Sequence, residues 1–435
     1  MAASEVQQTV EAVWRIESPK LIARLARIVR DVGRAEELAQ DAMVAALEQW
    51  PDSGVPQNPG AWLMATAKHR AIDAVRRDKR LEQKQAELGR LQESSQDDAI
   101  ASLDESLDHE IGDDLLRLVF TACHPVLSSE ARVALTLRLL GGLTTAEIAR
   151  AFLVPEPTIA QRIVRAKRTL QEENVPFETP RGAELSERLA SVLSVIYLIF
   201  NEGYTATAGD DWMRPALCDD ALRLGRMVAE LAPLEPEVHG LAALLEIQAS
   251  RARARVGPDG EPILLLEQNR SLWDRLLIRR GLTALDRAEQ LRADRGPYTL
   301  QAAIAACHAR AGDADATDWG LIASLYAELA LTNPSPIVEL NRAVAISMAD
   351  GPQAGLDLVD RLLSEPALAG YHLFPSVRGD LLFKLGRKRE AREEFERAAG
   401  MTKNERERTL LLGRAQECGR GDWDCPDTAI GGSWI

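Results

Sequence analysis

Apolar residues recur at helical spacing along almost the whole 435-residue chain, and no stretch shows the strict alternation of a half-buried strand. Alanine, leucine, arginine and glutamate are abundant, while aromatic residues make up only 5%, a composition that favours helix over sheet. The length also exceeds what a single hydrophobic core usually supports. The sequence therefore predicts an all-α protein built from several domains.

Composition excludes several classes of protein. No run of about 18 uncharged apolar residues is present, and the N-terminus lacks the basic-then-apolar order of a signal peptide, so we expect a cytoplasmic protein. The five cysteines are odd in number and include no CxxC motif, which argues against a disulfide framework or a zinc site. We expect no metal and no cofactor. Because the net charge is -14, any nucleic-acid-binding surface must be local.

Charge and turn-forming residues divide the chain into segments. Residues 91–116 contain nine acidic residues and no lysine or arginine, which predicts a solvated linker. Further breaks, rich in proline and glycine, lie at 172–184 and 292–297. The predicted parts are a first domain (1–90), an acidic linker (91–111), a second domain (112–176), a helical extension (177–297), helical hairpins (298–405) and a tail (406–435).

The hairpin segment shows an internal repeat. In residues 380–399, Leu385-Gly386 is followed by Ala391, Phe395 and Ala398, which matches the second half of a tetratricopeptide unit. Looser copies occupy 339–363 and 300–336. We therefore predict a tetratricopeptide-like array, with a generic array of helical hairpins as the alternative.

The stretch Gly142–Leu170 has the pattern of a helix-turn-helix. Thr144 and Glu147 have the spacing of a capping box, and Pro155 and Pro157 mark the start of a second helix. That helix has one apolar stripe and an opposite face without acidic residues. Since arginine and glutamine pair with base edges and basic side chains contact phosphates, we infer a DNA-reading helix. Its candidate contact residues are Thr158, Gln161, Arg162, Arg165, Lys167 and Arg168.

A second basic face lies upstream, in residues 58–80. Residues 61–80 contain six basic residues and two aspartates, and an aromatic residue stands near the head of this segment. Basic residues suit phosphate contact, and an aromatic ring suits stacking on an unpaired base. The candidate contact residues are Trp62, Lys68, His69, Arg70, Asp73, Arg76, Arg77 and Arg80.

Residues 31–50 predict an amphipathic helix of the opposite character. Leu38, Ala42, Val44 and Ala45 supply apolar surface, and the acidic residues are expected to face solvent. Because an acidic patch repels DNA, its expected partner is a basic protein surface. The candidate docking residues are Asp31, Glu36, Glu37, Gln40 and Asp41.

These three stretches, in this order and at this separation, resemble the diagnostic segments of sigma-70 family factors of the extracytoplasmic-function type. The resemblance covers roughly residues 10–90 and 112–171. It implies a transcription initiation factor without enzymatic activity of its own, since RNA polymerase carries out the chemistry. Residues 31–47 would dock on the clamp helices of the polymerase β′ subunit, and the second domain would sit on the β flap.

The resemblance also implies two promoter contacts. Residues 61–80 would open the minus-10 element, and residues 156–170 would enter the major groove at minus-35. His69 stands where these factors commonly carry asparagine, so the resemblance assigns it no base-specific role. The stretches 196–206, 268–275 and 334–345 resemble the extension of a sigma subgroup whose long C-terminal half is tetratricopeptide-like, which implies regulation by the extension.

Other interpretations are weaker. A one-component regulator with a helical sensor explains 142–170 but leaves 31–50 and 61–80 without a role. An enzyme would need a recognisable catalytic motif, and the chain has no P-loop, HExxH, GxSxG or dinucleotide fingerprint. Asn201, Glu202 and Tyr204 fit either a ligand site or a helix-ending turn. The C-terminal half either masks the basic faces intramolecularly or docks a protein partner.

Overall fold

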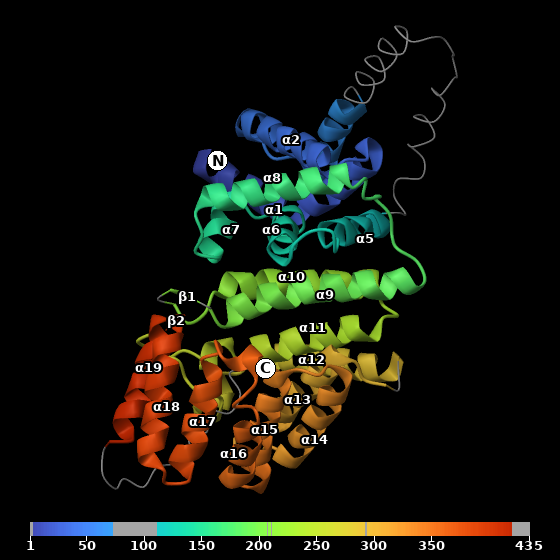
Figure 1. Cartoon of the computed structure of the whole chain (residues 1–435). Helices are drawn as coiled ribbons and strands as arrows, with labels where there is room; N and C mark the ends of the chain where they lie inside the picture. The colour runs from blue at the N-terminus through green and yellow to red at the C-terminus, as the bar shows by residue number, and fades with distance from the viewer. Residues whose placement is uncertain (1–2, 73–110, 207, 210, 292–293, 420–435) are drawn as a thin grey trace. The chain divides into compact units, whose positions relative to one another are not determined.

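The structure is a computed structural model, and it describes residues 3–72, 111–206, 208–209, 211–291 and 294–419 (Figure 1). The chain separates into two compact units, residues 1–196 and 197–435. Their boundary falls inside one helix, α9 (Ala183–Tyr204). The prediction of an all-α protein is confirmed. Among the described residues, no helix combines the length and the apolar character needed to cross a membrane.

The first unit begins with two long helices that pack against each other, followed by a helix at 59–72 that reaches the end of the described segment. After the gap, α5 packs against α1, while α6 and α7 pack against α8. The labelled helices are α1 (Ala3–Val29), α2 (Val32–Ser53), α5 (Ile111–Ala122), α6 (Ser129–Leu139), α7 (Thr145–Ala151) and α8 (Glu156–Glu172).

The second unit continues from α9 as a succession of packed helices with short 3-10 turns. Its helices are α10 (Pro215–Leu231), α11 (Pro236–Ala249), α12 (Arg275–Leu291), α13 (Pro297–Arg310), α14 (Trp319–Thr332), α15 (Pro336–Asp350), α16 (Pro352–Arg361), α17 (Leu373–Lys384), α18 (Lys388–Met401) and α19 (Glu405–Glu417). The 3-10 turns are η1 (Ala252–Ala254), η2 (Leu265–Glu267), η3 (Arg270–Leu272) and η4 (Pro366–Leu368). Two-residue strands, β1 (Ala208–Gly209) and β2 (Lys403–Asn404), pair in parallel.

Each predicted repeat copy forms a helical hairpin: α13 with α14, α15 with α16, and α17 with α18. Small residues let the helices approach closely. A Cβ on Gly379 of α17 would lie 3.1 Å from the Phe395 ring of α18. Phe395, Ala391 and Ala398 are fully buried between these helices, as the repeat pattern predicts. The hairpins are thus observed, while their assignment as tetratricopeptide units stays a prediction.

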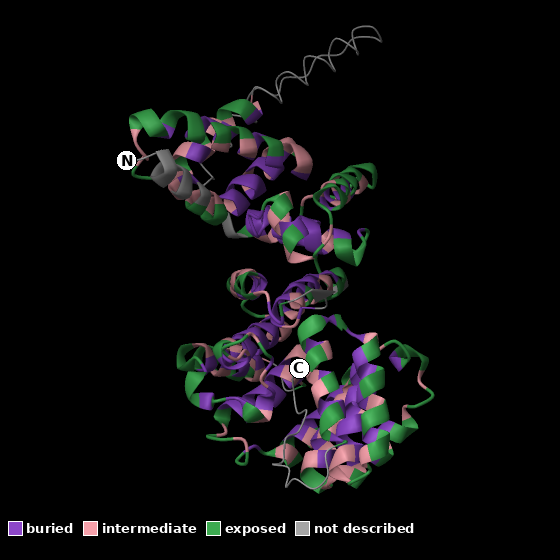
Figure 2. Cartoon of the chain, turned by 90° about the vertical axis from the view of Figure 1, so that its left-hand side faces the viewer, coloured by how far each residue is buried: buried purple, intermediate pink, exposed green. Residues whose placement is uncertain are grey.

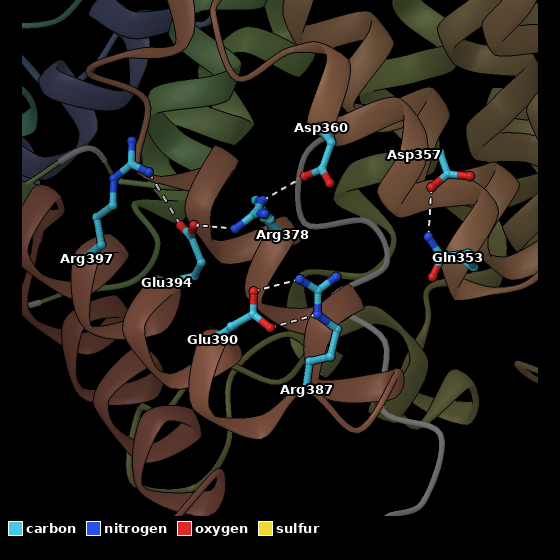
Figure 3. Close-up of polar contacts among 8 residues, drawn as sticks. All are labelled: Gln353, Asp357, Asp360, Arg378, Arg387, Glu390, Glu394 and Arg397. Atoms are coloured by element: carbon cyan, nitrogen blue, oxygen red, sulfur yellow. Dashed lines mark hydrogen bonds and ion pairs between the residues drawn. The ribbon is translucent and has the colours of Figure 1, made fainter.

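Polar contacts link successive hairpins (Figure 3). Arg378 of α17 donates to Asp360 of α16 at 2.8 Å and to Glu394 of α18 at 2.8 Å. Residues 406–435 are the predicted tail, but the structure has a further helix there. This helix, α19, packs on α18. Within each unit the buried residues lie on the inward faces of the helices, and exposed residues cover the outside (Figure 2).

Candidate functional site

The predicted helix-turn-helix is formed by α7 and α8. The capping box is present: the Glu147 amide donates to the Thr144 hydroxyl at 3.1 Å, and the Thr144 amide donates to the Glu147 carboxylate at 2.8 Å. Pro155 is the N-cap of α8, and Pro157 lies in its first turn, where a missing N–H leaves no hydrogen bond unmade. The local sequence therefore sets both the start of α7 and the start of α8.

Helix α8 buries the predicted apolar stripe and exposes most of the predicted contact face. The buried residues are Ile159, Ile163, Ala166 and Leu170, which confirms the helical winding. The side chains of Thr158, Gln161, Arg165 and Arg168 are exposed, and that of Arg162 is half-buried. Because Arg168 pairs with Glu172 at 2.6 Å on a solvated surface, it remains accessible to a competing phosphate.

Glu36 is a correction to the sequence analysis. It was expected to face solvent, but it is 2% exposed and lies between two cations from the helix-turn-helix part of the unit. Arg138 of α6 donates to its carboxylate at 2.6 Å, and Lys167 of α8 forms an ion pair with the same carboxylate. Gln40 also donates to it at 2.6 Å. Lys167 is therefore turned toward α2, on the flank of α8.

Further contacts join α1 to the helix-turn-helix within the first unit. Arg15 of α1 pairs with Glu147 at 2.7 Å. Partial burial raises the pKa of Glu147, but hydrogen bonds from Thr144 and the charge of Arg15 outweigh it and lower that pKa overall. Gly142, just before α7, has φ +68° and lies so close to α1 that a Cβ would be 3.2 Å from the Ser18 hydroxyl. The turn before the helix-turn-helix is thus shaped by α1.

Asp114 gives a second correction. It belongs to the acidic stretch 91–116 that was predicted to be solvated, yet its side chain is buried in α5. Arg117 donates to it at 2.6 Å, and Arg27 of α1 lies 3.6 Å away. The rest of the predicted linker, up to residue 110, lies outside the described residues.

The helix at 59–72 carries the described part of the second basic face. Trp62 packs edge-on against the buried Trp50, with 5.4 Å between ring centroids. His69 and Arg70 are exposed, Lys68 is half-buried, and Arg70 lies 3.6 Å from Asp41. Four further candidates fall outside the described residues: Asp73, Arg76, Arg77 and Arg80.

The remaining acidic candidates of α2 have different environments. Glu37 and Asp41 are exposed, and Gln40 is half-buried against Glu36. Asp31 caps α2, because its side chain accepts a hydrogen bond from the Arg34 amide at 2.8 Å. The accessible acidic surface of α2 is therefore smaller than the sequence pattern predicted.

Helix α9 holds the end of α5, a contact that sequence reasoning missed. Arg188 donates to the Phe120 carbonyl at 2.9 Å, and the Ser191 hydroxyl donates to the Cys123 carbonyl at 2.7 Å. These are carbonyls at a helix C-terminus, which lack partners within their own helix. Arg132 of α6 also donates to Ser191 at 2.5 Å. No local signal in residues 183–196 marks this role.

The polar residues at the end of α9 are all engaged. Glu202 forms an ion pair with Arg214, and the Tyr204 hydroxyl donates to Gln248 at 3.1 Å. The described cysteines are buried thiols, and the described residues contain no cluster with the composition of a metal site.

Three protein families match separate parts of the chain. Sigma-70 region 2 matches residues 14–81, sigma-70 region 4 matches residues 117–170, and a family of unknown function, DUF6596, matches residues 188–289. The first two matches coincide with the helices that carry the candidate site residues. The third begins at Arg188, where α9 docks on α5.

Curated relatives agree with these matches. An uncharacterized protein, R00370, from Rhizobium meliloti (strain 1021) is 44% identical over 397 residues, 90% of this chain and 92% of that protein. The ECF RNA polymerase sigma factor SigK of Mycobacterium ulcerans (strain Agy99) is 30% identical over 148 residues, 34% of this chain and 75% of SigK. SigK of Mycobacterium tuberculosis (strain ATCC 25618 / H37Rv) is 30% identical over 149 residues, 33% of this chain and 74% of SigK. The helix-turn-helix, the paired upstream helices and these similarities together show that the chain belongs to the ECF family of RNA polymerase sigma factors, which work with core polymerase at promoter DNA.

Proposed function

We propose that the exposed face of α8 reads the minus-35 element through Thr158, Gln161, Arg162, Arg165 and Arg168. The helix that starts at residue 59 would open the minus-10 element, with Trp62 near its start and the exposed His69 and Arg70 near its described end. The observation that supports this most is the cationic outer face of α8, which lies opposite a fully buried stripe and whose acidic residue, Glu172, pairs with Arg168 at the end of the helix. Polymerase would supply the bond-forming chemistry, as it does for sigma factors in general.

The exposed acidic residues of α2, Glu37 and Asp41, would dock on the clamp helices of the β′ subunit. Region 4 would sit on the β flap. Charge supports this assignment, because an acidic surface favours a basic protein partner over DNA. Glu36 is buried in the described arrangement, so it joins this surface only after region 2 and region 4 separate.

The first unit would therefore have to open on the promoter. The minus-10 and minus-35 elements are centred about 25 base pairs apart, which is about 85 Å along B-DNA. A compact unit of about 196 residues has a radius of gyration near 16 Å, and hence an extent of about 40 Å. The closed arrangement is too short to contact both elements.

Transcription with purified components tests this function. Full-length protein, core polymerase and a promoter fragment should give promoter-specific run-off transcripts that are absent without the protein. The protein should also bind core polymerase in the absence of DNA. Promoter binding without core polymerase, combined with no transcripts, would refute the proposal and favour a one-component regulator.

For the C-terminal half we propose a modulating role, either by masking the basic faces or by docking a partner. The contacts of α9 decide where the chain can be shortened to test this role. A chain cut near residue 175 would lose the turns of α9 that hold α5, so lost activity would reflect damage to region 4. A chain ending at Tyr204 keeps those contacts. Higher transcription from that shortened chain supports masking, and lower transcription supports a required partner.

A further inference from the structure

A cavity of about 690 Å³ lies wholly within the second unit. Its walls come from the end of α9, from α13, α14 and α15, from the start of α17, and from the junction of α18 and α19. This volume falls in the range of pockets that enclose small organic ligands. Residues more than 200 positions apart in the sequence meet here, from Tyr197 to Glu407.

Tyr326 is the residue in this cavity that most needs an explanation. Its side chain belongs to α14, lines the cavity and is 4% exposed. Among the described residues, its hydroxyl has no hydrogen-bond partner. Burial raises the pKa of Tyr326 well above its usual range, so the hydroxyl stays protonated and can donate. The hydroxyl oxygen is not among the fully buried unpaired atoms, so it lies at the cavity surface, where a ligand atom would accept its hydrogen bond.

Several other polar groups of the wall have partners within the protein. The Tyr197 hydroxyl donates to Gln301 at 3.1 Å. The carboxylate of Glu202 is paired with Arg214, and that of Glu407 lies 2.9 Å from the His372 ring. Because both carboxylates are already engaged by side chains of the protein, the wall disfavours a cationic ligand.

The remaining lining is apolar and aromatic. Leu329, Val338 and Leu373 contribute aliphatic surface, and Tyr371 adds a ring whose hydroxyl has no partner among the described residues. Burial raises the pKa of Tyr371 as well, so this hydroxyl is also a donor. Two neutral donors thus lie in a largely apolar cavity, and the exposed Lys403 also contributes to its lining.

We propose that this cavity binds a small neutral organic molecule with an aromatic or aliphatic body and a carbonyl or carboxamide oxygen that accepts a hydrogen bond from Tyr326. The proposal concerns the extension and does not depend on how the sigma domains contact the promoter. Helix α9 carries the cavity residues Tyr197 and Asn201 as well as Arg188 and Ser191, which hold α5. Through this helix, ligand binding in the cavity would affect the contacts that hold α5 in region 4.

Three probes of matched shape test the proposal: benzamide, benzoate and benzamidinium, which are neutral, anionic and cationic. Each is titrated against the full-length protein with ligand-observed saturation-transfer NMR. Benzamide should show saturation transfer, and the two ions should bind more weakly. The Tyr326→Phe variant should raise the Kd for benzamide about five- to tenfold, the usual effect of losing one hydrogen bond. This measurement needs neither polymerase nor promoter, so its failure would leave the sigma function untouched.

Two controls separate binding from folding. Tyr298→Phe removes a hydroxyl from a half-buried ring that packs on Tyr197 but does not line the cavity, so it should leave benzamide binding unchanged. The Tm of Tyr326→Phe should equal or exceed that of the unmodified chain, because the lost hydroxyl has no protein partner. Absence of benzamide binding, an unchanged Kd in Tyr326→Phe, or tighter binding of benzoate than of benzamide would each overturn the proposal.

Discussion

Replacing Glu36 with glutamine should open the first unit. The change keeps the shape of the side chain but removes the charge that holds Arg138 and Lys167. Breaking a buried ion pair from one side costs about 3–5 kcal/mol. The side chains of Arg138 and Lys167 are 19% and 22% exposed, so water screens part of that cost. We therefore expect Glu36→Gln to destabilise the closed form by about 2 kcal/mol. The ratio of closed to open forms would fall about thirtyfold, since about 1.4 kcal/mol corresponds to a factor of ten.

Two measurements report this shift. The radius of gyration from small-angle scattering should increase. The apparent Kd for core polymerase should fall by up to the same thirtyfold, because a binding-competent form that is rarely populated weakens the observed affinity. Glu37→Gln is the matched control, since Glu37 is the exposed neighbour on the same helix. It should leave the scattering unchanged.

Glu36 would itself face polymerase after opening, so a perturbation from the opposite side is also needed. Arg138→Met removes one cation from α6, and we assign Arg138 no contact with DNA or polymerase. It should shift scattering and affinity in the same direction as Glu36→Gln. If both variants scatter like Glu37→Gln and bind core polymerase with unchanged affinity, the buried ion-pair network does not hold the unit closed.

Thr144→Ala removes the cap of α7 and should lower the free energy of unfolding of the first unit by about 1 kcal/mol, measured by denaturant titration; an unchanged midpoint would contradict the role of the cap. Arg165→Ala and Arg168→Ala should each weaken promoter binding by the holoenzyme and reduce the salt dependence of log K by about one unit, whereas an unchanged slope would exclude a phosphate contact. Burial raises the pKa of the Cys123 thiol to about 11, above its unfolded value, so its stabilising contribution is complete below about pH 8.5 and is lost as the pH rises toward 11. Alkylation of Cys123 at pH 8 should therefore follow unfolding, and fast labelling of the native protein would show otherwise. Burial lowers the pKa of His308 to about 3, so its contribution is complete above about pH 6.5 and declines as the pH falls toward 3. His308→Gln should move the acid-unfolding midpoint of the second unit to lower pH, and a midpoint that does not move would contradict this.

Features with local causes were predictable from the sequence. The capping box of Thr144 and Glu147 and the apolar stripe of α8 lie within single helical turns or at helical spacing, so the helix-turn-helix follows from propensity and periodicity. The hairpin of α17 and α18 was predictable for a similar reason, because its small residues mark the close approach of neighbouring helices. The order of the three motifs was enough to indicate the family.

The environment of each charged residue was decided only by the tertiary structure. Helical winding places Glu36 on the polar side of α2, and nothing nearby in the sequence announces Arg138, which is 102 residues away. Asp114 likewise reads as part of an acidic stretch, although Arg27 and Arg117 make its burial possible. A charge is buried only where partners from other helices satisfy it, and those partners meet only when the chain folds. The same reason explains the cavity around Tyr326, whose walls come from segments more than 200 residues apart. The sequence determined the helices and the family, and long-range packing decided which of their polar groups face solvent, one another or the cavity.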